Sequence, residues 1–226
     1  MGRRPPLDLS LYLVTDPAMC DQLGLTATVS AAVGAGVSVV QLRDSRATDD
    51  EMVSLGRELV ATLRGTGVPL IIDDRVHLVS AMGAAGAHVG QSDLGVEPAR
   101  ALIGPDAYLG LSVQTIGHVA AAQEHADGAV DYLGVGPVWG TATKPDAAPP
   151  GGVETLRQIV SASPWPCVAI GGIGLDRLAQ VRGTGAAGAA VVSAICGQPD
   201  VAAATRGLRA AWDAWDAWDA WDKAST

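Results

Sequence analysis

Eight short apolar segments, recurring at steps of roughly 20–25 residues, constrain this chain more than any other feature of its sequence. They cover residues 9–14, 37–42, 69–72, 87–89, 108–111, 132–135, 168–170 and 189–192. The segments are continuously apolar rather than alternating, which is typical of parallel strands covered on both faces. We therefore expect eight buried parallel strands.

Helical sequences lie between these strands. Thr48 and Glu51 form a capping-box pattern at the front of an amphipathic run that continues to Leu63. Further helices are predicted to begin near Thr26, Val76, Glu97, Thr115, Val153 and Leu175. A doubly wound dinucleotide fold would carry a glycine-rich G-x-G-x-x-G turn after its first strand, and residues 15–17 have no such turn. The sequence therefore predicts an α/β fold, a single (β/α)8 TIM barrel over residues 1–210.

Residues 211–226 form a low-complexity tail with a Trp-Asp-Ala repeat, predicted to extend the barrel at its C-terminus. At a spacing of three residues, successive tryptophans rotate by about 60° around a helix, so they cannot form one narrow stripe. We expect an extension of the last helix, with one or two tryptophans packed on the barrel. The alternative interpretation is a contact between copies in a homo-oligomer.

Composition and charge exclude several classes of function. A net charge of -9 argues against nucleic acid as a partner. No apolar run reaches the ~18 residues of a membrane helix, and no apolar segment like that of a secretory signal follows Arg3 and Arg4. The cysteines, Cys20, Cys167 and Cys196, have neither metal-ligand nor disulfide spacing. We expect a cytoplasmic protein that binds neither nucleic acid nor membranes.

Ionisable side chains gather where the predicted strands end, and in a (β/α)8 barrel these ends line the active site. Asp74 ends the third strand and Asp93 follows the fourth. Two close carboxylates repel one another unless a cation lies between them, and Mg2+ prefers oxygen ligands. The alternative is structural: Asp74 would pair with Arg75, and Asp93 would cap the next helix.

Cations and glycine-rich turns follow other strands. Arg43 and Lys144 follow the second and sixth, where they could bind a pyrophosphate. The long loop 136–145 also carries Thr141 and Thr143, and loops of this length at a barrel mouth are often functional. Backbone N–H groups after the seventh and eighth strands commonly bind phosphate in barrels. We therefore expect small phosphorylated molecules as substrates.

The histidines have neither metal-ligand spacing nor a serine or cysteine arranged as a nucleophile beside them. We interpret all four as structural; they are His77, His88, His118 and His125.

Nine phrases, in order, resemble the thiamine-phosphate synthase family over about residues 11–195. They are residues 11–16, 40–44, 70–76, 88–94, 110–113, 131–138, 141–144, 169–173 and 191–195. The resemblance implies a (β/α)8 transferase of thiamine biosynthesis. It would join an aminopyrimidine methyl diphosphate to a thiazole phosphate and release pyrophosphate.

The resemblance also implies roles for individual residues. Asp74 and Asp93 match the Mg2+ ligands. The positions that match contacts to the pyrimidine diphosphate are Gln41, Arg43, Ser112 and Lys144, of which the last three are the expected catalytic residues. The positions that match the thiazole-phosphate site are Thr141, Thr143, Gly172, Val192 and Ser193.

Two positions depart from the family pattern. Ser45 stands where the family usually has lysine, and Asp73 stands where it usually has asparagine. Each change makes the diphosphate pocket less positive. Arg46 could supply the missing charge, and Asp73 could accept a hydrogen bond from the pyrimidine amino group. The other reading is a paralogue with altered activity.

Two further functions remain open at this stage. A thiazole tautomerase of related fold would need a general base, such as histidine, near the fifth or sixth strand, and residues 136–138 contain none. A non-catalytic ligand-sensing barrel would use its tail as a partner surface.

Overall fold

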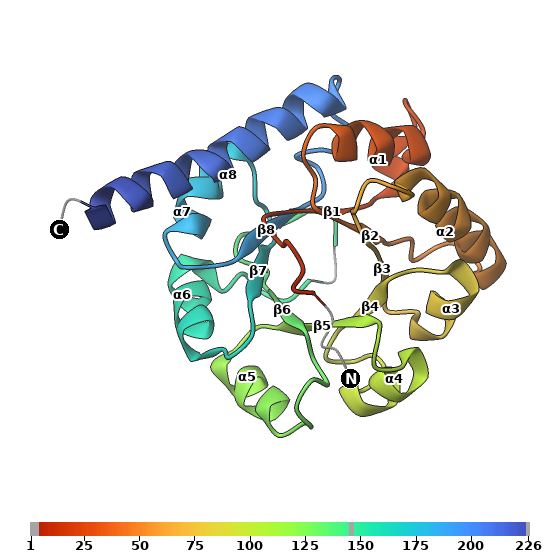
Figure 1. Ribbon diagram of the computed structural model, residues 1–226, viewed down its shortest axis with the longest axis horizontal. Coiled ribbons are helices and arrows are strands. Elements are labelled where there is room, and N and C mark those ends of the chain that lie inside the picture. Colours follow the sequence, from red (N-terminus) through yellow and green to blue (C-terminus); the bar gives the residue numbers. More distant parts are fainter. Residues whose placement is uncertain (1–4, 145–146, 225–226) are drawn as a thin grey trace.

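The computed structural model describes residues 5–144 and 147–224, with side chains described as far as residue 214. Within these residues, eight parallel strands pair in sequence order and close into a barrel, β8 pairing with β1 (Figure 1). The strands are β1 (Leu11–Val14), β2 (Val39–Leu42), β3 (Leu70–Asp73), β4 (Gly86–Val89), β5 (Tyr108–Val113), β6 (Tyr132–Val135), β7 (Cys167–Ile170) and β8 (Gly188–Val191). The predicted (β/α)8 fold is confirmed.

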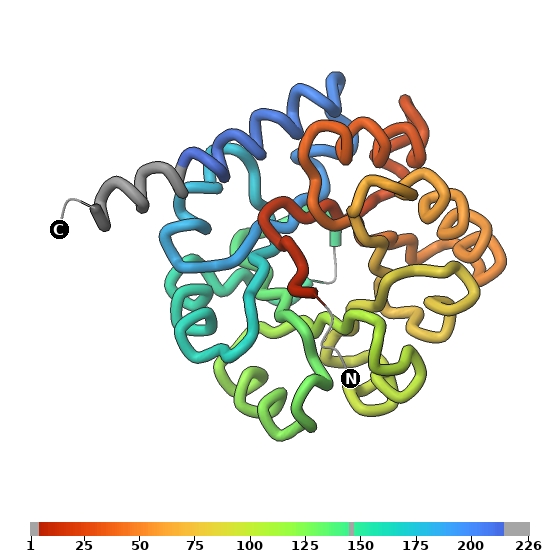
Figure 2. Tube along the Cα trace, in the orientation of Figure 1, coloured from red at the N-terminus to blue at the C-terminus, as the bar shows by residue number. Residues whose placement is uncertain are grey.

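Helices surround the barrel, one or more after each strand (Figures 1 and 2). The α-helices are α1 (Leu25–Gly34), α2 (Asp49–Leu63), α3 (Val79–Met82), α4 (Val96–Ile103), α5 (Ile116–Gln123), α6 (Gly152–Ala162), α7 (Leu178–Arg182) and α8 (Val201–Ala224). Short 3-10 helices, η1 (Pro17–Cys20), η2 (Val76–Leu78) and η3 (Leu175–Arg177), precede α1, α3 and α7. The capping box predicted at α2 is present: Glu51 N donates to Thr48 Oγ1, and Thr48 N donates to Glu51 Oε2.

Alternation along each strand divides the core into two parts. One set of side chains faces the helices, as Leu11 and Leu13 do on β1. The other set fills the barrel interior, and there Tyr12, Val39, Ile71 and Tyr132 pack together. The inward-facing residues nearest the C-terminal ends of the strands therefore form the floor of any cavity at that end.

The strand β3 lies one residue later than predicted at both ends, covering Leu70–Asp73 instead of residues 69–72. Asp73 therefore belongs to the strand, where its two-residue spacing from Ile71 directs its side chain into the barrel. Asp74 follows with a φ of 57°, the left-handed conformation that aspartate tolerates better than most residues. The Asp73 carboxylate therefore points into the barrel, whereas the Asp74 carboxylate follows the end of β3.

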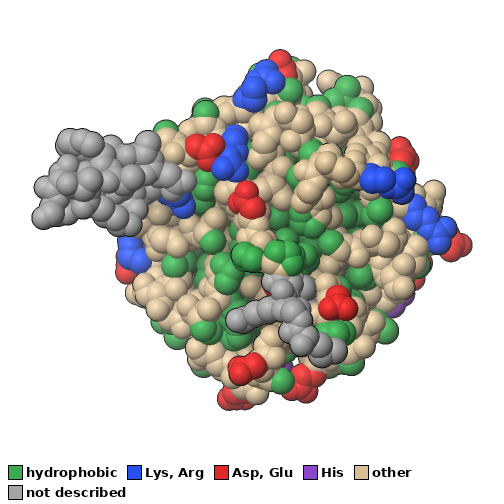
Figure 3. All heavy atoms as spheres, in the orientation of Figure 1, with side chains coloured by type: hydrophobic (Ala, Val, Ile, Leu, Met, Phe, Trp, Pro, Cys, Tyr) green, Lys and Arg blue, Asp and Glu red, His purple; other side chains and the backbone are tan. Residues whose placement is uncertain are grey.

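The N-terminal segment closes one end of the barrel. Leu7 packs against the interior cluster, and the Tyr108 hydroxyl donates to the Pro5 carbonyl at 2.8 Å. Figure 3 shows hydrophobic side chains gathered near the centre of this face, with charged side chains around them. A ligand must therefore enter from the C-terminal end of the strands.

The last helix, α8, packs against α7 and α1 and continues without a break across the boundary predicted at residues 210 and 211. Trp212 is buried, with the Arg182 guanidinium 4.6 Å from its ring centroid. The remaining tryptophans of the repeat lie beyond the described side chains, and the oligomer contact, the alternative interpretation of the repeat, stays untested. No helix in the described part of the chain is long and apolar enough to cross a membrane.

Two separate glycine-to-alanine substitutions test the packing of the barrel. A Cβ atom on Gly188 would lie 1.6 Å from the Leu9 carbonyl oxygen, whereas one on Gly207 of α8 would meet nothing within 4 Å. We expect Gly188→Ala to lower the free energy of unfolding by on the order of 3 kcal/mol. Gly207→Ala should raise it by about 0.5–1 kcal/mol. Urea unfolding measures both, and equal effects of the two changes would contradict this packing.

Candidate active site

A cavity of about 500 Å³ opens at the C-terminal ends of the strands. It is lined by every residue predicted for the substrate site, and by one of the two predicted metal ligands. These residues are Gln41, Arg43, Asp73, Asp93, Ser112, Thr141, Thr143, Lys144, Gly172, Val192 and Ser193. Its volume is within the range of small-molecule sites. The strand ends therefore converge on one mouth.

Arg43 and Asp73 form an ion pair on one side of this cavity, with Arg43 Nε 3.2 Å from Asp73 Oδ2. Both side chains are largely buried. Burial raises the pKa of Asp73 to about 6, and the charges of Arg43 and Lys144 partly offset this rise. The ion pair directs the Arg43 guanidinium toward a carboxylate of its own chain, so a phosphate must compete with Asp73 for it.

The two carboxylates expected to bind the metal lie against one another. Asp93 Oδ2 accepts a hydrogen bond from Gly90 N at 2.8 Å. Asp74 lies at the rim, and its pKa is raised to about 7 by partial burial, then by the Asp73 charge and the contact with Asp93. Carboxylates held this close favour either a shared proton or a bound cation.

Neither structural alternative for these carboxylates is observed. The Arg75 guanidinium binds Asp49, with Nη1 3.0 Å from Oδ1. The helix α4 begins after Gly95, without a side-chain cap. The described residues contain no group of three or more histidine, cysteine or acidic side chains that could hold a metal. Two carboxylates completed by water and substrate phosphate are a common arrangement for Mg2+, so the donor set fits this ion.

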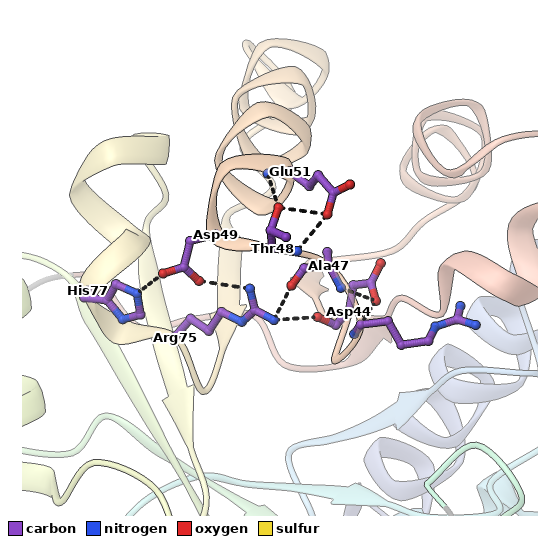
Figure 4. A network of polar contacts seen from close by, with 8 residues as sticks. Asp44, Ala47, Thr48, Asp49, Glu51, Arg75 and His77 are labelled. Atoms are coloured by element: carbon purple, nitrogen blue, oxygen red, sulfur yellow. Dashed lines mark hydrogen bonds and ion pairs between the residues drawn. The ribbon is translucent and has the colours of Figure 1, made fainter.

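A polar network holds the loop between β2 and α2, which carries Ser45 and Arg46 (Figure 4). Arg75 Nη2 donates to the Ala47 carbonyl at 2.6 Å, and its Nη1 binds Asp49, whose other oxygen is 2.7 Å from His77 Nε2. Within the described chain, Ser45 and Arg46 are exposed and are not among the cavity residues. The network therefore fixes the loop directly after Arg43.

The loops after β6 and β7 pack tightly together at the opposite side of the mouth. A Cβ atom on Gly172, where φ is 62°, would lie 2.6 Å from the Gly140 carbonyl oxygen, so glycine is required. Arg177 donates to the Gly172 carbonyl, and its guanidinium lies 5.0 Å from the Trp139 ring centroid. The hydroxyls of Thr141 and Thr143 are 2.8 Å apart. These contacts position backbone N–H groups and hydroxyls for an anion.

Sequence reasoning missed the polar groups deeper in the cavity. His88, interpreted as structural, lines the cavity together with Tyr12. Its Nε2 is 2.9 Å from Ser112 Oγ and its Nδ1 is 3.1 Å from Tyr132 Oη. Burial lowers the pKa of His88 to about 4, so the ring is neutral. The usable signal was alternation: on β3, β4 and β5 the polar residues Asp73, His88 and Ser112 all face inward.

A closed parallel barrel whose C-terminal mouth combines carboxylates, cations and glycine-rich loops defines a class, the (β/α)8 enzymes that handle phosphorylated substrates. The family model described as thiamine monophosphate synthase matches residues 11–195. The chain belongs to this family, as its motifs predicted.

Curated relatives and a solved structure agree with this assignment. The chain is 47% identical to the thiamine-phosphate synthase of Psychrobacter sp., over 85% of this chain and 90% of that protein. It is 46% identical to the thiamine-phosphate synthase of Azorhizobium caulinodans, over 90% and 95% of the two chains. The thiamine phosphate pyrophosphorylase of Pyrococcus furiosus superposes with a TM-score of 0.81 at 33% identity, covering 91% and 96%.

Replacing Arg75 tests the network around the β2–α2 loop. Arg75→Ala removes the donors to Ala47 and Asp49, so we expect faster amide exchange over residues 44–48 and faster trypsin cleavage after Arg46. Arg64→Ala, at the exposed end of α2, is the matched control and should change neither. Unchanged exchange in Arg75→Ala would show that the loop is held by other contacts.

Proposed function

We propose that this protein is a thiamine-phosphate synthase, which joins an aminopyrimidine methyl diphosphate to a thiazole phosphate and releases pyrophosphate. The observation that carries the proposal is that Arg43, Lys144, Asp93 and Gly172 line one and the same cavity. Arg43 and the carboxylates stand on one side of it, and the loops after β6 and β7, which carry Lys144 and Gly172, stand on the other. That division matches two phosphorylated substrates bound face to face.

Arg43 and Lys144 bind the diphosphate in this proposal. Both line the cavity, and both charges act on Asp73. Once a diphosphate oxygen replaces the Asp73 carboxylate on the Arg43 guanidinium, Arg43 and Lys144 stabilise the negative charge that grows on the leaving group. Bound Mg2+ would supply further charge neutralisation for the departing pyrophosphate. Asp74 and Asp93 would hold this ion.

The remaining cavity residues hold the two rings. Gln41, Asp73 and Ser112 face the pyrimidine in this proposal. The thiazole phosphate is placed against the glycine-rich side, at Thr141, Thr143, Gly172, Val192 and Ser193. Departure of pyrophosphate leaves a methylene cation that the electron-rich pyrimidine delocalises, and the thiazole nitrogen then forms the new carbon–nitrogen bond. The reaction needs no protein nucleophile.

The tautomerase alternative is less well supported. His88 is the one histidine among the described cavity residues, and both of its ring nitrogens already have partners within the protein. A proton-transfer base would have to give up one of these hydrogen bonds.

We also propose that the protein acts in the cytoplasm on small phosphorylated molecules. Its cysteines, Cys20, Cys167 and Cys196, are all free and buried. Free thiols are typical of a reducing compartment.

The direct test is product formation. Purified protein with both substrates and Mg2+ should give thiamine phosphate and pyrophosphate in equal amounts, and EDTA should stop the reaction. We expect Asp93→Ala to lower the rate by on the order of 100-fold. Asp106→Ala, an exposed change at the opposite end of the barrel, is the matched control and should keep full activity. No product from the folded wild-type protein would refute the proposal.

Asp73→Asn tests the ion pair with Arg43. The change keeps the side-chain shape but removes the charge that competes with diphosphate, so KM for the pyrimidine diphosphate should fall several-fold. Ser45→Lys, at an exposed position outside the cavity, should have a smaller effect. Steady-state kinetics with each substrate varied in turn measures both. A higher KM in Asp73→Asn would mean that the carboxylate itself binds substrate.

A further inference from the structure

Five polar side chains form a continuous hydrogen-bonded line along the floor of the cavity. Gln41 Nε2 donates to Tyr12 Oη at 3.1 Å, and Tyr12 Oη is 2.9 Å from Tyr132 Oη. Tyr132 Oη is 3.1 Å from His88 Nδ1, and His88 Nε2 is 2.9 Å from Ser112 Oγ. The line joins β2, β1, β6, β4 and β5. Its two ends, Gln41 and Ser112, both face the cavity.

The surrounding strands leave room for this line and hold it in place. A Cβ atom on Gly110 would lie 2.3 Å from His88 Nδ1, and one on Gly134 would lie 2.7 Å from His88 Cε1. These two glycines therefore create the space that the imidazole occupies. Tyr12 and Tyr132 are almost completely buried, at 1% and 0% exposed. Water cannot readily replace a missing partner there, and an unpaired buried hydroxyl is costly.

The donors and acceptors available along this line fix the direction of its hydrogen bonds. Because Gln41 donates to Tyr12, the Tyr12 hydroxyl proton pairs only if it points to Tyr132. Tyr132 then donates to His88 Nδ1, which places the imidazole proton on Nε2, directed at Ser112 Oγ. In this arrangement every buried hydroxyl proton has an acceptor. In the reverse direction, with Gln41 still donating, the Tyr12 proton would have none among these five groups.

We propose that this line is a positioning relay that fixes which hydrogen-bonding groups Gln41 and Ser112 present to the ligand. Ser112 Oγ accepts from His88, so its own proton is free to donate into the cavity. Gln41 uses Nε2 on Tyr12, so its Oε1 is free to accept. His88, Tyr12 and Tyr132 act through these two residues and need not touch the substrate themselves.

The acceptor on Gln41 and the donor on Ser112 together select which kind of pyrimidine ring binds. This inference rests on the proposed function. An aminopyrimidine presents an amino donor and ring-nitrogen acceptors, which complement an acceptor on Gln41 and a donor on Ser112. The corresponding pyrimidinone presents a carbonyl acceptor and a ring N–H donor and would mismatch both. A site built to pair one pattern discriminates strongly against the reverse, because buried polar groups are left unpaired. The relay thus makes the floor specific for the amino form.

The imidazole tautomer can be read in the wild-type protein by 15N–1H correlation NMR. His88→Gln identifies the His88 signals. We expect the proton on Nε2 and an unprotonated Nδ1. A proton on Nδ1 would reverse the line and overturn the proposal without any enzymatic measurement.

Ligand discrimination supplies the second test. The probes are the aminopyrimidine methyl monophosphate and its pyrimidinone analogue, and calorimetry gives both affinities. Wild type should prefer the amino form. Tyr132→Phe removes the donor to His88 and should reduce that preference about tenfold, the effect of about one misaligned hydrogen bond. Tyr108→Phe, the same change on β5 but bonded to Pro5 at the closed end, should leave the preference unchanged.

An unchanged preference in folded Tyr132→Phe would overturn the relay. The synthase proposal fails separately, if wild type makes no product while still preferring the amino probe. If Tyr132→Phe does not fold, Tyr12→Phe interrupts the same line one step earlier and should lower the preference in the same direction. If the protein forms product while His88 carries its proton on Nδ1, the synthase proposal holds and the relay proposal is wrong.

Discussion

The closure of eight parallel strands into one ring is the constraint on which the rest of the structure depends. Closure fixes the register of each strand against both neighbours, and alternation then decides which side chains enter the barrel. Asp73 pairs in register with His88, and His88 with Gly110. A polar side chain on one strand therefore faces a glycine on the next. A one-residue slip in any strand would exchange this layer for apolar side chains from the helix-facing core.

Charge in the mouth is balanced locally, although the chain as a whole is negative. Burial raises the pKa of Asp73 and Asp74, the charge of Asp93 raises both further, and the charge of Lys144 lowers both. Arg43 takes part through its contact with Asp73. In the proposed function, an anionic substrate would engage Arg43 and Lys144, and a divalent cation held by Asp74 and Asp93 would neutralise the carboxylates. Either one alone would leave part of the mouth unpaired, which favours their binding as a complex.

Much of the fold and most of the site could be predicted from the sequence, because both follow from local patterns. Continuous apolar runs mark the strands, and polar residues after them mark the mouth. The deeper features depend on which side chains face inward and on strand register, which the continuous apolar runs do not show. Asp73 enters the barrel because β3 ends one residue later than its apolar run. His88 reads as an isolated polar residue within a strand, and only the glycines of β5 and β6 reveal the space for its ring. Likewise, α8 continues past residue 210 because helical geometry does not end where composition changes.

Ser45 and Asp73, the two departures from the family pattern, differ in burial. This difference decides how strongly each affects the charge in the cavity. Ser45 is on the exposed loop that the hydrogen bond from Arg75 to the Ala47 carbonyl holds in place. Solvent screens the charge of a lysine lost at this position, and the cavity surface is unchanged. Asp73 lies inside, next to Arg43, where a charge is screened less. Its carboxylate also raises the pKa of Tyr12 and Tyr132, the two middle hydroxyls of the relay, after the larger effects of burial. The Asp73 carboxylate therefore contacts Arg43 and also acts, with a smaller effect than burial, on the two tyrosine hydroxyls of the relay, so that one residue links the Arg43 side of the cavity to its floor.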